Sequence, residues 1–197
     1  KEKYQQNLQT IQKQIKQIEN LVNEFSDFAR MPKPLIKENN LYEVINENII
    51  LLSKIDSNIK IKLINHLHNN FLANFDYEQF NRLFFNLIKN SIESIQEKAL
   101  NTSKINKKIS IEIEQIKDYI KLIITDDGTG FPEDKKEEII KPYYTTKEKG
   151  SGLGLSIVSK IINDHNGSIT FKNINDGAQI EILLPNNNVN WNINYWW

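Results

Sequence analysis

Two asparagines and a glutamate in the middle of this chain are spaced to share one face of a helix. Asn86, Asn90 and Glu93 stand at positions i, i+4 and i+7 within residues 77–100, whose apolar residues recur at helical spacing. Amide and carboxylate oxygens suit a hard cation such as Mg²⁺, which proteins usually hold through one or two such groups. The pattern predicts a candidate Mg²⁺ site, and the alternative is a solvated helix face on which Glu93 pairs with Lys89.

An acidic residue followed by two glycines forms a second candidate site. Residues 119–126 are predicted to form a strand that ends at Asp126, and Gly128 and Gly130 follow it. A carboxylate at the end of a buried strand could accept a hydrogen bond from an exocyclic amine, while the glycines let the backbone approach a flat ligand. The alternative is an Asp-Gly hairpin turn, which explains Gly128 but not Gly130, because no strand is predicted directly after it.

Three alternating glycines precede the last predicted helix. Gly150, Gly152 and Gly154 lead into a helix at about residues 152–164, so consecutive backbone N–H groups and the positive end of a helix would meet there. That combination predicts a phosphate-binding site, to which Lys147 would add a positive charge. The spacing matches neither a P-loop nor a Rossmann fingerprint, and a plain flexible hinge is the alternative.

These candidate groups must be positioned by an interleaved set of helices and strands. The predicted elements are helices at 4–29, 41–53, 77–100 and 152–164, and strands at 58–65, 71–75, 109–114, 119–126, 168–172 and 178–184, with Asp76 as an N-cap. Residues 132–151 are charged and lack an apolar pattern, so we expect a loop with at most a short helix near 134–140. Because there are no regular βαβ units, the order predicts an α+β fold, a two-layer α/β sandwich.

The first predicted helix carries a seven-residue apolar repeat. Its apolar residues are spaced alternately four and three apart: Tyr4, Leu8, Ile11, Ile15, Ile18, Val22, Phe25 and Ala29. This narrow stripe predicts a coiled coil or a helical bundle, and the alternative is an amphipathic helix that lies on its own domain. Pro32 and Pro34 would end the helix, so we place a domain boundary there.

The composition excludes several classes of function. The 25 Lys and Arg residues balance the 25 Asp and Glu residues, which argues against a nucleic acid partner, and the lack of cysteine excludes disulfides and thiolate chemistry. The longest apolar run, Ile49–Leu52, is far too short to span a bilayer, and the first residues lack the apolar stretch of a signal peptide. We expect a soluble, cytoplasmic chain with domains at 1–32 and 33–185 and an Asn- and Trp-rich tail at 186–197.

Taken in order, the candidate motifs resemble those of one known family. The segments NLIKNSIE (86–93), DDGTGFP (126–132), KPYYTTK (141–147), GSGLGLSIV (150–158) and NDGAQIEILLP (175–185) are similar to the N box, glycine boxes and F box of sensor histidine kinases. Their ATP-binding domain has the Bergerat fold shared with gyrase, Hsp90 and MutL. Residues 25–34 (FSDFARMPKP) resemble the end of the dimerisation helix in NtrY-type nitrogen-regulation kinases. The resemblance covers about residues 1–184 and implies a Bergerat-type sandwich preceded by a bundle helix.

The resemblance implies a role for each matching residue. Asn90 would bind Mg²⁺, and Asn86 would lie nearby on the phosphate side. Asp126 would accept a hydrogen bond from the adenine amino group, and Lys147 would lie near the γ-phosphate. The implied ATP-binding set is Asn86, Asn90, Asp126, Gly128, Gly130, Lys147, Gly150, Gly152, Leu153 and Gly154.

The sequence departs from this family in two places. Ile140 and Tyr143 stand in the F box where two phenylalanines are usual, which changes the aromatic packing of that segment. The kinases phosphorylate a histidine followed by an acidic residue, and none of His66, His68 and His165 has that context. We therefore expect the chain to be a fragment whose phosphoacceptor helix lies upstream.

The resemblance implies a phosphotransferase that needs partners. It would bind ATP with Mg²⁺ and pass the γ-phosphate to a histidine of the upstream dimerisation helix, and thence to a response regulator receiver domain, with a homodimer in the full-length protein. One alternative is an ATP-hydrolysing machine of the gyrase or MutL kind. In those proteins a glutamate acts as base where this chain has Asn86, and an amide cannot take a proton from water. The other alternative is a non-catalytic nucleotide-sensing or dimerisation module.

Overall fold

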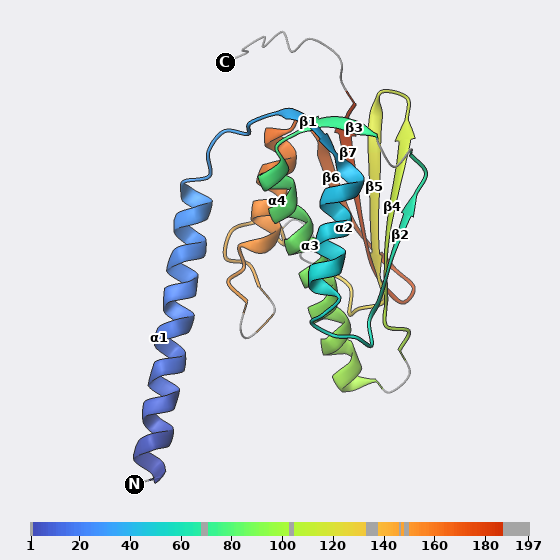
Figure 1. Cartoon of the computed structure of the whole chain (residues 1–197). Helices are drawn as coiled ribbons and strands as arrows, with labels where there is room; N and C mark the ends of the chain where they lie inside the picture. The colour runs from blue at the N-terminus through green and yellow to red at the C-terminus, as the bar shows by residue number, and fades with distance from the viewer. Residues whose placement is uncertain are drawn as a thin grey trace.

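A long N-terminal helix precedes an α/β sandwich (Figure 1). The computed structural model describes residues 2–67, 71–102, 105–132, 138–145, 147 and 150–186. In chain order the elements are α1 (Glu2–Ala29), β1 (Lys37–Asn40), α2 (Leu41–Leu52), β2 (Lys60–Asn65), β3 (Leu72–Phe75), α3 (Tyr77–Asn101), β4 (Lys108–Ile116), β5 (Tyr119–Asp126), α4 (Gly154–Asp164), β6 (Ser168–Ile174) and β7 (Gly177–Pro185). No helix in the described ranges has the length and apolar character needed to cross a membrane.

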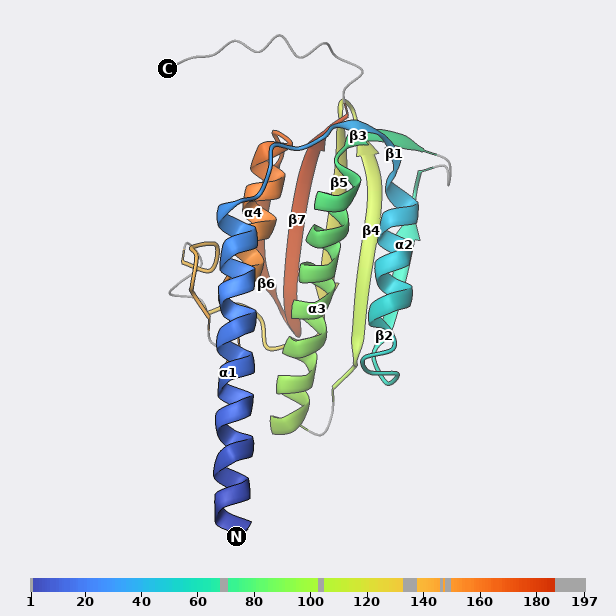
Figure 2. The same ribbon diagram turned by 60° about the vertical axis from the view of Figure 1, so that its left-hand side comes forward.

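Five strands form one mixed sheet, and three helices cover one face of it. The strand order is β2-β4-β5-β7-β6, with β2 and β4 parallel and every other neighbouring pair antiparallel. Figure 2 shows α2, α3 and α4 side by side over that face. The two-layer α/β sandwich predicted from the sequence is confirmed.

Strand β5 lies in the middle of the sheet and carries the alternation that creates a covered face. Ile120, Leu122 and Ile124 are at most 2% exposed, whereas the residues between them are half-buried. Asp126 occupies the next position of the same alternation, so its side chain lies on the helix-covered face rather than in solvent. The strand thus brings a carboxylate to the end of the hydrophobic core.

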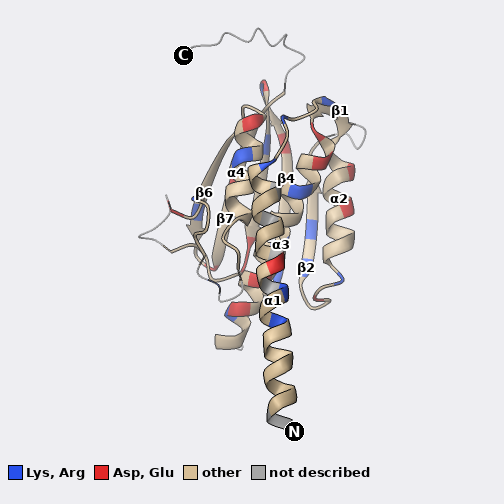
Figure 3. Cartoon of the chain, turned by 90° about the vertical axis from the view of Figure 1, so that its left-hand side faces the viewer, with Lys and Arg blue, Asp and Glu red and all other residues tan. Residues whose placement is uncertain are grey.

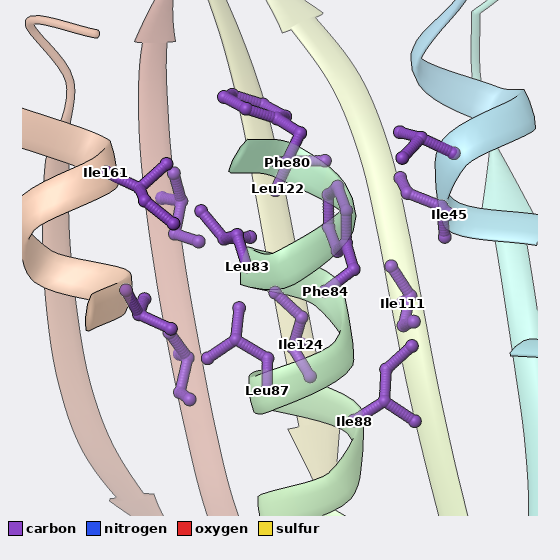
Figure 4. Close-up of a cluster of buried hydrophobic side chains, with 14 of the residues drawn as sticks. Ile45, Phe80, Leu83, Phe84, Leu87, Ile88, Ile111, Leu122, Ile124 and Ile161 are labelled. Atoms are coloured by element: carbon purple, nitrogen blue, oxygen red, sulfur yellow. The ribbon is translucent and has the colours of Figure 1, made fainter. Parts of the chain in front are cut away.

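Helix α3 runs across the centre of the covered face. Its apolar side chains recur every three or four residues, and the fully buried ones include Phe80, Leu83, Phe84, Leu87 and Ile88. Figure 4 shows them over Leu122 and Ile124 of β5, with Ile45 of α2 and Ile161 of α4 on either side. Each such side chain contributes roughly 1.5–3 kcal/mol relative to an exposed position. The core therefore holds α3 as a fixed platform for the polar residues on its flanks.

Helix α1 leaves most of its apolar stripe in solvent. Its residues Tyr4, Leu8, Ile11, Ile15, Ile18 and Val22 are between 42% and 70% exposed. The helix also carries no charged residue from Tyr4 to Gln12, as Figure 3 shows. Phe28, near the end of the helix, and Met31, just beyond it, pack partly against the core. Residues 4–22 therefore do not lie on their own domain, and their stripe is open to a partner.

Local features of the fold agree with the sequence predictions in part. Asp76 caps α3 as predicted, since its Oδ1 accepts a hydrogen bond from Gln79 N at 3.0 Å. Strand β1 was not predicted, and it pairs antiparallel with β3 in a separate two-stranded sheet. The short helix considered near 134–140 falls mostly on residues outside the described ranges, and residues 138–140 form a turn. Residues 187–197 of the predicted tail also lie outside those ranges.

Candidate functional site

The two asparagines of α3 lie against the start of α4. Asn86 and Asn90 are half-buried, and a Cβ atom at Gly154 would lie 3.2 Å from Asn86 Oδ1 and 3.6 Å from Asn90 Nδ2. Asn86 Nδ2 donates to Arg82 O at 2.8 Å, which leaves the Asn86 oxygen on the side of α4. The helix face that carries these amides is therefore partly covered by α4, and glycine at position 154 keeps space beside them.

Helix α4 begins without a side-chain cap. Its N-cap residue is Leu153, a buried apolar residue that cannot accept hydrogen bonds from the first-turn N–H groups. Those donors and the partial positive charge of the helix end favour an anion. The start of α4 and the two amides together are therefore suited to a phosphate group.

The glycine segment before α4 is packed against Tyr143 and Lys147 of the preceding segment KPYYTTK (141–147). Gly152 has φ +69°, and a Cβ atom there would lie 2.5 Å from the carbonyl carbon of Tyr143. Tyr143 N donates to Gly152 O at 3.0 Å, and Gly150 N donates to Lys147 O at 3.2 Å. Tyr143 also stacks on Phe25 of α1, with ring centroids 6.2 Å apart. A plain flexible hinge does not account for these contacts.

Asp126 is a buried carboxylate, 5% exposed. Its Oδ2 accepts a hydrogen bond from Ser91 Oγ and its Oδ1 accepts one from Gly128 N, both at 2.9 Å. Burial raises the pKa of Asp126 above its ordinary value, and the hydrogen bonds from Gly128 and Ser91 act in the opposite direction. The Ala178 backbone acts in the same direction as these two donors. Because a carboxylate has about four acceptor positions, the three donors leave room for a hydrogen bond from a ligand.

The two glycines after Asp126 allow close backbone packing. A Cβ atom at Gly128 would lie 2.2 Å from Ser94 Oγ, and Gly130 has φ +78° with Asn173 Oδ1 only 3.0 Å from its Cβ position. The chain does not turn back as a strand after Gly128, and the next strand in the described residues is β6. The hairpin alternative is therefore wrong.

Lys147 forms an ion pair with a residue of α3. Its Nζ lies 2.6 Å from Glu93 Oε2. Lys89 also approaches the Glu93 carboxylate, at 3.9 Å, so the considered Glu93–Lys89 pair is present but is the longer of the two. The positive charge predicted for the phosphate site is thus held beside α3 and balanced by a carboxylate.

Sequence reasoning did not single out Ser91, although a signal for it existed. Ser91 is 2% exposed and occupies the apolar stripe that Phe84, Ile88 and Ile95 define on α3. A hydroxyl at such a position needs a partner, because burying an unpaired polar group is unfavourable. The partner is Asp126, 35 residues away in the sequence.

Asn173 and Lys98 hold the loop after β5, and sequence reasoning missed both. Asn173 Oδ1 accepts from Phe131 N at 2.7 Å, and Asn173 Nδ2 donates to Phe131 O at 2.8 Å. Lys98 Nζ donates to Asp127 O at 3.1 Å and also to the backbone oxygen of Asp176. These contacts depend on how β6 and β7 fold back onto β5, which no local sequence pattern reveals.

Residues 75–188 match the family model of the histidine kinase-, DNA gyrase B-, and HSP90-like ATPases. The chain belongs to this family. It is 30% identical over 184 residues to nitrogen regulation protein NtrY of Azorhizobium caulinodans, across 93% of this chain and 24% of that protein. It is also 31% identical over 175 residues to sporulation kinase C of Bacillus subtilis, across 87% of this chain and 39% of that protein. The resemblance to NtrY-type sensor kinases is confirmed, and the chain spans about a quarter of the length of NtrY.

Solved structures of histidine kinases share the fold. The catalytic domain of the kinase ThkA superposes with a TM-score of 0.66 at 29% identity, covering 77% of this chain and 95% of that domain. Full-length ShkA in complex with AMPPNP superposes with a TM-score of 0.71 at 19% identity, covering 84% of this chain and 35% of ShkA. At that identity the second match shows the fold alone.

Proposed function

We propose that this chain is the ATP-binding catalytic portion of a two-component sensor histidine kinase. It binds Mg-ATP and transfers the γ-phosphate to a histidine on a helix upstream of α1, from which a response regulator receives it. The observation that carries this proposal is the arrangement along α3, whose successive turns contact the uncapped start of α4 and then the buried Asp126 carboxylate. One end of that arrangement suits phosphates and the other suits adenine.

Asp126 recognises adenine in this proposal. The exocyclic amino group of adenine donates to the carboxylate, which already accepts hydrogen bonds from Ser91, Gly128 and the Ala178 backbone and has about four acceptor positions in all. Gly128 and Gly130 let the backbone approach the flat ring. Guanine presents a carbonyl oxygen at the equivalent position, and a carboxylate repels it. The site therefore discriminates between ATP and GTP.

The phosphates and Mg²⁺ occupy the other end. The phosphate-binding residues are Asn86, Lys147, Gly150, Gly152, Leu153 and Gly154, and Asn90 is the Mg²⁺ ligand. The donor set fits, because Mg²⁺ takes most of its oxygen ligands from water and substrate phosphates and needs few from the protein, and the Asn90 amide oxygen can supply one. No cluster of three or more acidic or histidine side chains in the described ranges could hold the metal without a nucleotide. When bound, Mg²⁺ neutralises part of the triphosphate charge.

A hydrolytic function of the gyrase or MutL kind is disfavoured at Asn86. The amide nitrogen of Asn86 is engaged as a donor to Arg82 O, and neither end of an amide takes a proton from water at neutral pH. The site therefore positions a nucleotide without supplying a base for attack by water. Transfer to an acceptor brought by another helix suits this chemistry better.

The partners follow from the same proposal. The exposed stripe of α1 pairs with the upstream helix and with a second copy in a homodimeric bundle. The kinase ThkA, whose fold this chain shares, has been solved in complex with the response regulator TrrA. We propose a response regulator receiver domain as the partner here also, no nucleic acid partner, and a cytoplasmic location for this catalytic portion.

Isothermal titration calorimetry with Mg-ATP, Mg-ADP and Mg-GTP tests the nucleotide assignment. We expect ATP and ADP to bind and GTP to bind at least about tenfold more weakly, which is the effect of one charged hydrogen bond. Equal affinity for ATP and GTP, or no nucleotide binding, would contradict the proposal.

A further inference from the structure

The contact between Lys147 and Glu93 joins two segments that are far apart in the sequence. Lys147 Nζ lies 2.6 Å from Glu93 Oε2, and the two side chains are 29% and 36% exposed. Lys147 belongs to the segment before the glycines, whereas Glu93 lies on α3. The ion pair therefore fixes the position of a lysine whose charge the candidate phosphate site would otherwise use.

Glu93 lies one helical turn beyond the candidate Mg²⁺ ligand Asn90. The spacing i, i+3 puts both residues on one face of α3, and Asn90 in turn lies against Gly154 at the start of α4. A carboxylate close to a bound triphosphate would repel it. Glu93 is thus a negative charge next to a site that must attract negative charge, and Lys147 is the group that neutralises it.

The backbone of Lys147 is held while its side chain is long enough to change partners. Lys147 N donates to Thr145 Oγ1 at 3.0 Å, and Gly150 N donates to Lys147 O at 3.2 Å. These bonds keep the lysine backbone beside the glycine segment. The ammonium group sits on a flexible four-carbon stem, so it can leave Glu93 without any movement of the backbone.

We propose that Glu93 is a counter-ion that competes with nucleotide phosphates for Lys147 and thereby limits both ATP affinity and the preference of the site for ATP over ADP. The inference rests on the proposed function and deepens it. Before nucleotide binds, Lys147 is paired with Glu93, and a nucleotide must draw the ammonium group away. Mg-ATP carries one more negative charge than Mg-ADP, so it competes more effectively for the lysine.

A double-mutant cycle with Glu93→Gln and Lys147→Gln tests this competition. Affinities for Mg-ATP and Mg-ADP are measured by calorimetry for the whole chain, the two single variants and the double variant. Glu93→Gln should tighten ATP binding about two- to fivefold, the range of a half-exposed ion pair, and should tighten ADP binding less. Lys147→Gln should weaken ATP binding about tenfold and reduce the ATP-to-ADP preference.

The coupling between the two positions separates competition from simple repulsion. Glu93→Gln changes the logarithm of the ATP dissociation constant. In the Lys147→Gln background that change should be at most about half as large, because it requires the lysine. An equal effect in both backgrounds overturns the inference and indicates repulsion through space. Weaker ATP binding in Glu93→Gln also overturns it, since Glu93 would then be a metal ligand or would hold Lys147 in its working position.

Lys89→Gln is the matched control, because Lys89 approaches the same carboxylate at 3.9 Å and its side chain, 46% exposed, is more exposed than that of Lys147. We expect an unchanged ATP-to-ADP preference in this variant, and a shift as large as that of Lys147→Gln would contradict a specific role for Lys147.

If the unaltered chain binds no nucleotide, the proposed function fails, and this inference fails with it. If the chain binds ATP normally but the cycle shows no coupling, only the inference fails.

Discussion

Asp126 combines a functional requirement with an unfavourable environment. Burial raises the pKa of its carboxyl group, so ionisation is harder in the folded chain than in the unfolded chain. The ionised form is nevertheless the one that offers acceptors on both oxygens. The hydrogen bonds from Ser91 and Gly128 offset part of the effect of burial and keep the carboxylate oriented.

Replacing Asp126 by asparagine should therefore separate binding from stability. Asp126→Asn removes the charge, and we expect ATP affinity to fall roughly ten- to a hundredfold, as for the loss of a charged hydrogen bond. The variant should unfold at the same temperature as the unaltered chain or at a higher one at neutral pH, because asparagine needs no buried charge. The amide nitrogen of the new side chain can donate to the Ser91 hydroxyl, which then accepts a hydrogen bond instead of donating one. Calorimetric titration and thermal unfolding measure the two effects, and unchanged ATP affinity would contradict the assignment.

Ser91 should affect the pH dependence of ATP binding. Its hydrogen bond lowers the pKa of Asp126, so Ser91→Ala should raise that pKa further and move the acidic decline of ATP affinity to higher pH. Titrations across a pH series measure this shift. Ser156→Ala is the control, since Ser156 is also buried but donates to Leu153 O. A uniform loss of affinity at every pH in Ser91→Ala would indicate a packing defect instead.

At the scale of elements, His165 connects the end of α4 to the start of α3. Its Nδ1 lies 2.8 Å from Ile161 O, and its Nε2 accepts a hydrogen bond from Asp76 N at 3.0 Å. The ring also lies edge-on to Phe80, with centroids 4.8 Å apart. Nε2 can accept only in the neutral imidazole, and burial lowers the pKa of His165 accordingly. The hydrogen bond with Ile161 O, followed by the charges of Asp76 and Asp164, acts on this pKa in the opposite direction by a smaller amount.

The fold should consequently lose stability as the pH falls below the ordinary histidine value of 6.5. The unfolded chain takes up the proton first, so the contribution of neutral His165 is present above that pH and declines below it. Urea unfolding at several pH values should show a steeper decline for the unaltered chain than for His165→Gln. The variant should be less stable at neutral pH because it loses the ring contacts. Parallel pH profiles would rule out this role.

The apolar stripe of α1 should drive self-association. Ile11, Ile15 and Ile18 are 51–61% exposed, and an unpartnered stripe of this kind seeks burial against another helix. We expect the chain to form concentration-dependent oligomers in light scattering, and replacing these three isoleucines by glutamine should restore a monomer. A strict monomer at high concentration before substitution would count against the bundle prediction.

The elements that could be predicted are those with a strong local pattern. The alternation of apolar residues in β5 and the apolar stripe of α3 predict which side chains form the core, and Asp76 was identifiable as the N-cap. Strand β1 could not be predicted, because its sequence KENN has no apolar residue and its pairing depends on β3. The ordered motifs suggested which residues form the site. The pairs Glu93–Lys147 and Ser91–Asp126 were not predictable, since each joins segments that only the tertiary fold brings together.

At the scale of the whole molecule, the described histidines are unsuited to accept a phosphate at the candidate site. His66 is exposed just after β2, at the edge of the sheet, and His165 is buried between α3 and α4. His68 lies outside the described residues. Neither described histidine is thus suited to be the acceptor, and we propose that the acceptor histidine lies on another segment, one that pairs with the exposed stripe of α1.

Transfer of radiolabelled γ-phosphate from Mg-ATP to a separate fragment that carries the upstream helix tests the central claim most directly. We expect slow, acid-labile and base-stable labelling of a histidine on that fragment and negligible labelling of this chain alone, because neither described histidine, His66 or His165, is placed to accept a phosphate. Asn90→Ala should abolish the transfer by removing the proposed metal ligand. Acid-stable phosphate on this chain by itself, or ATP binding with no transfer to the fragment, would contradict the histidine kinase account.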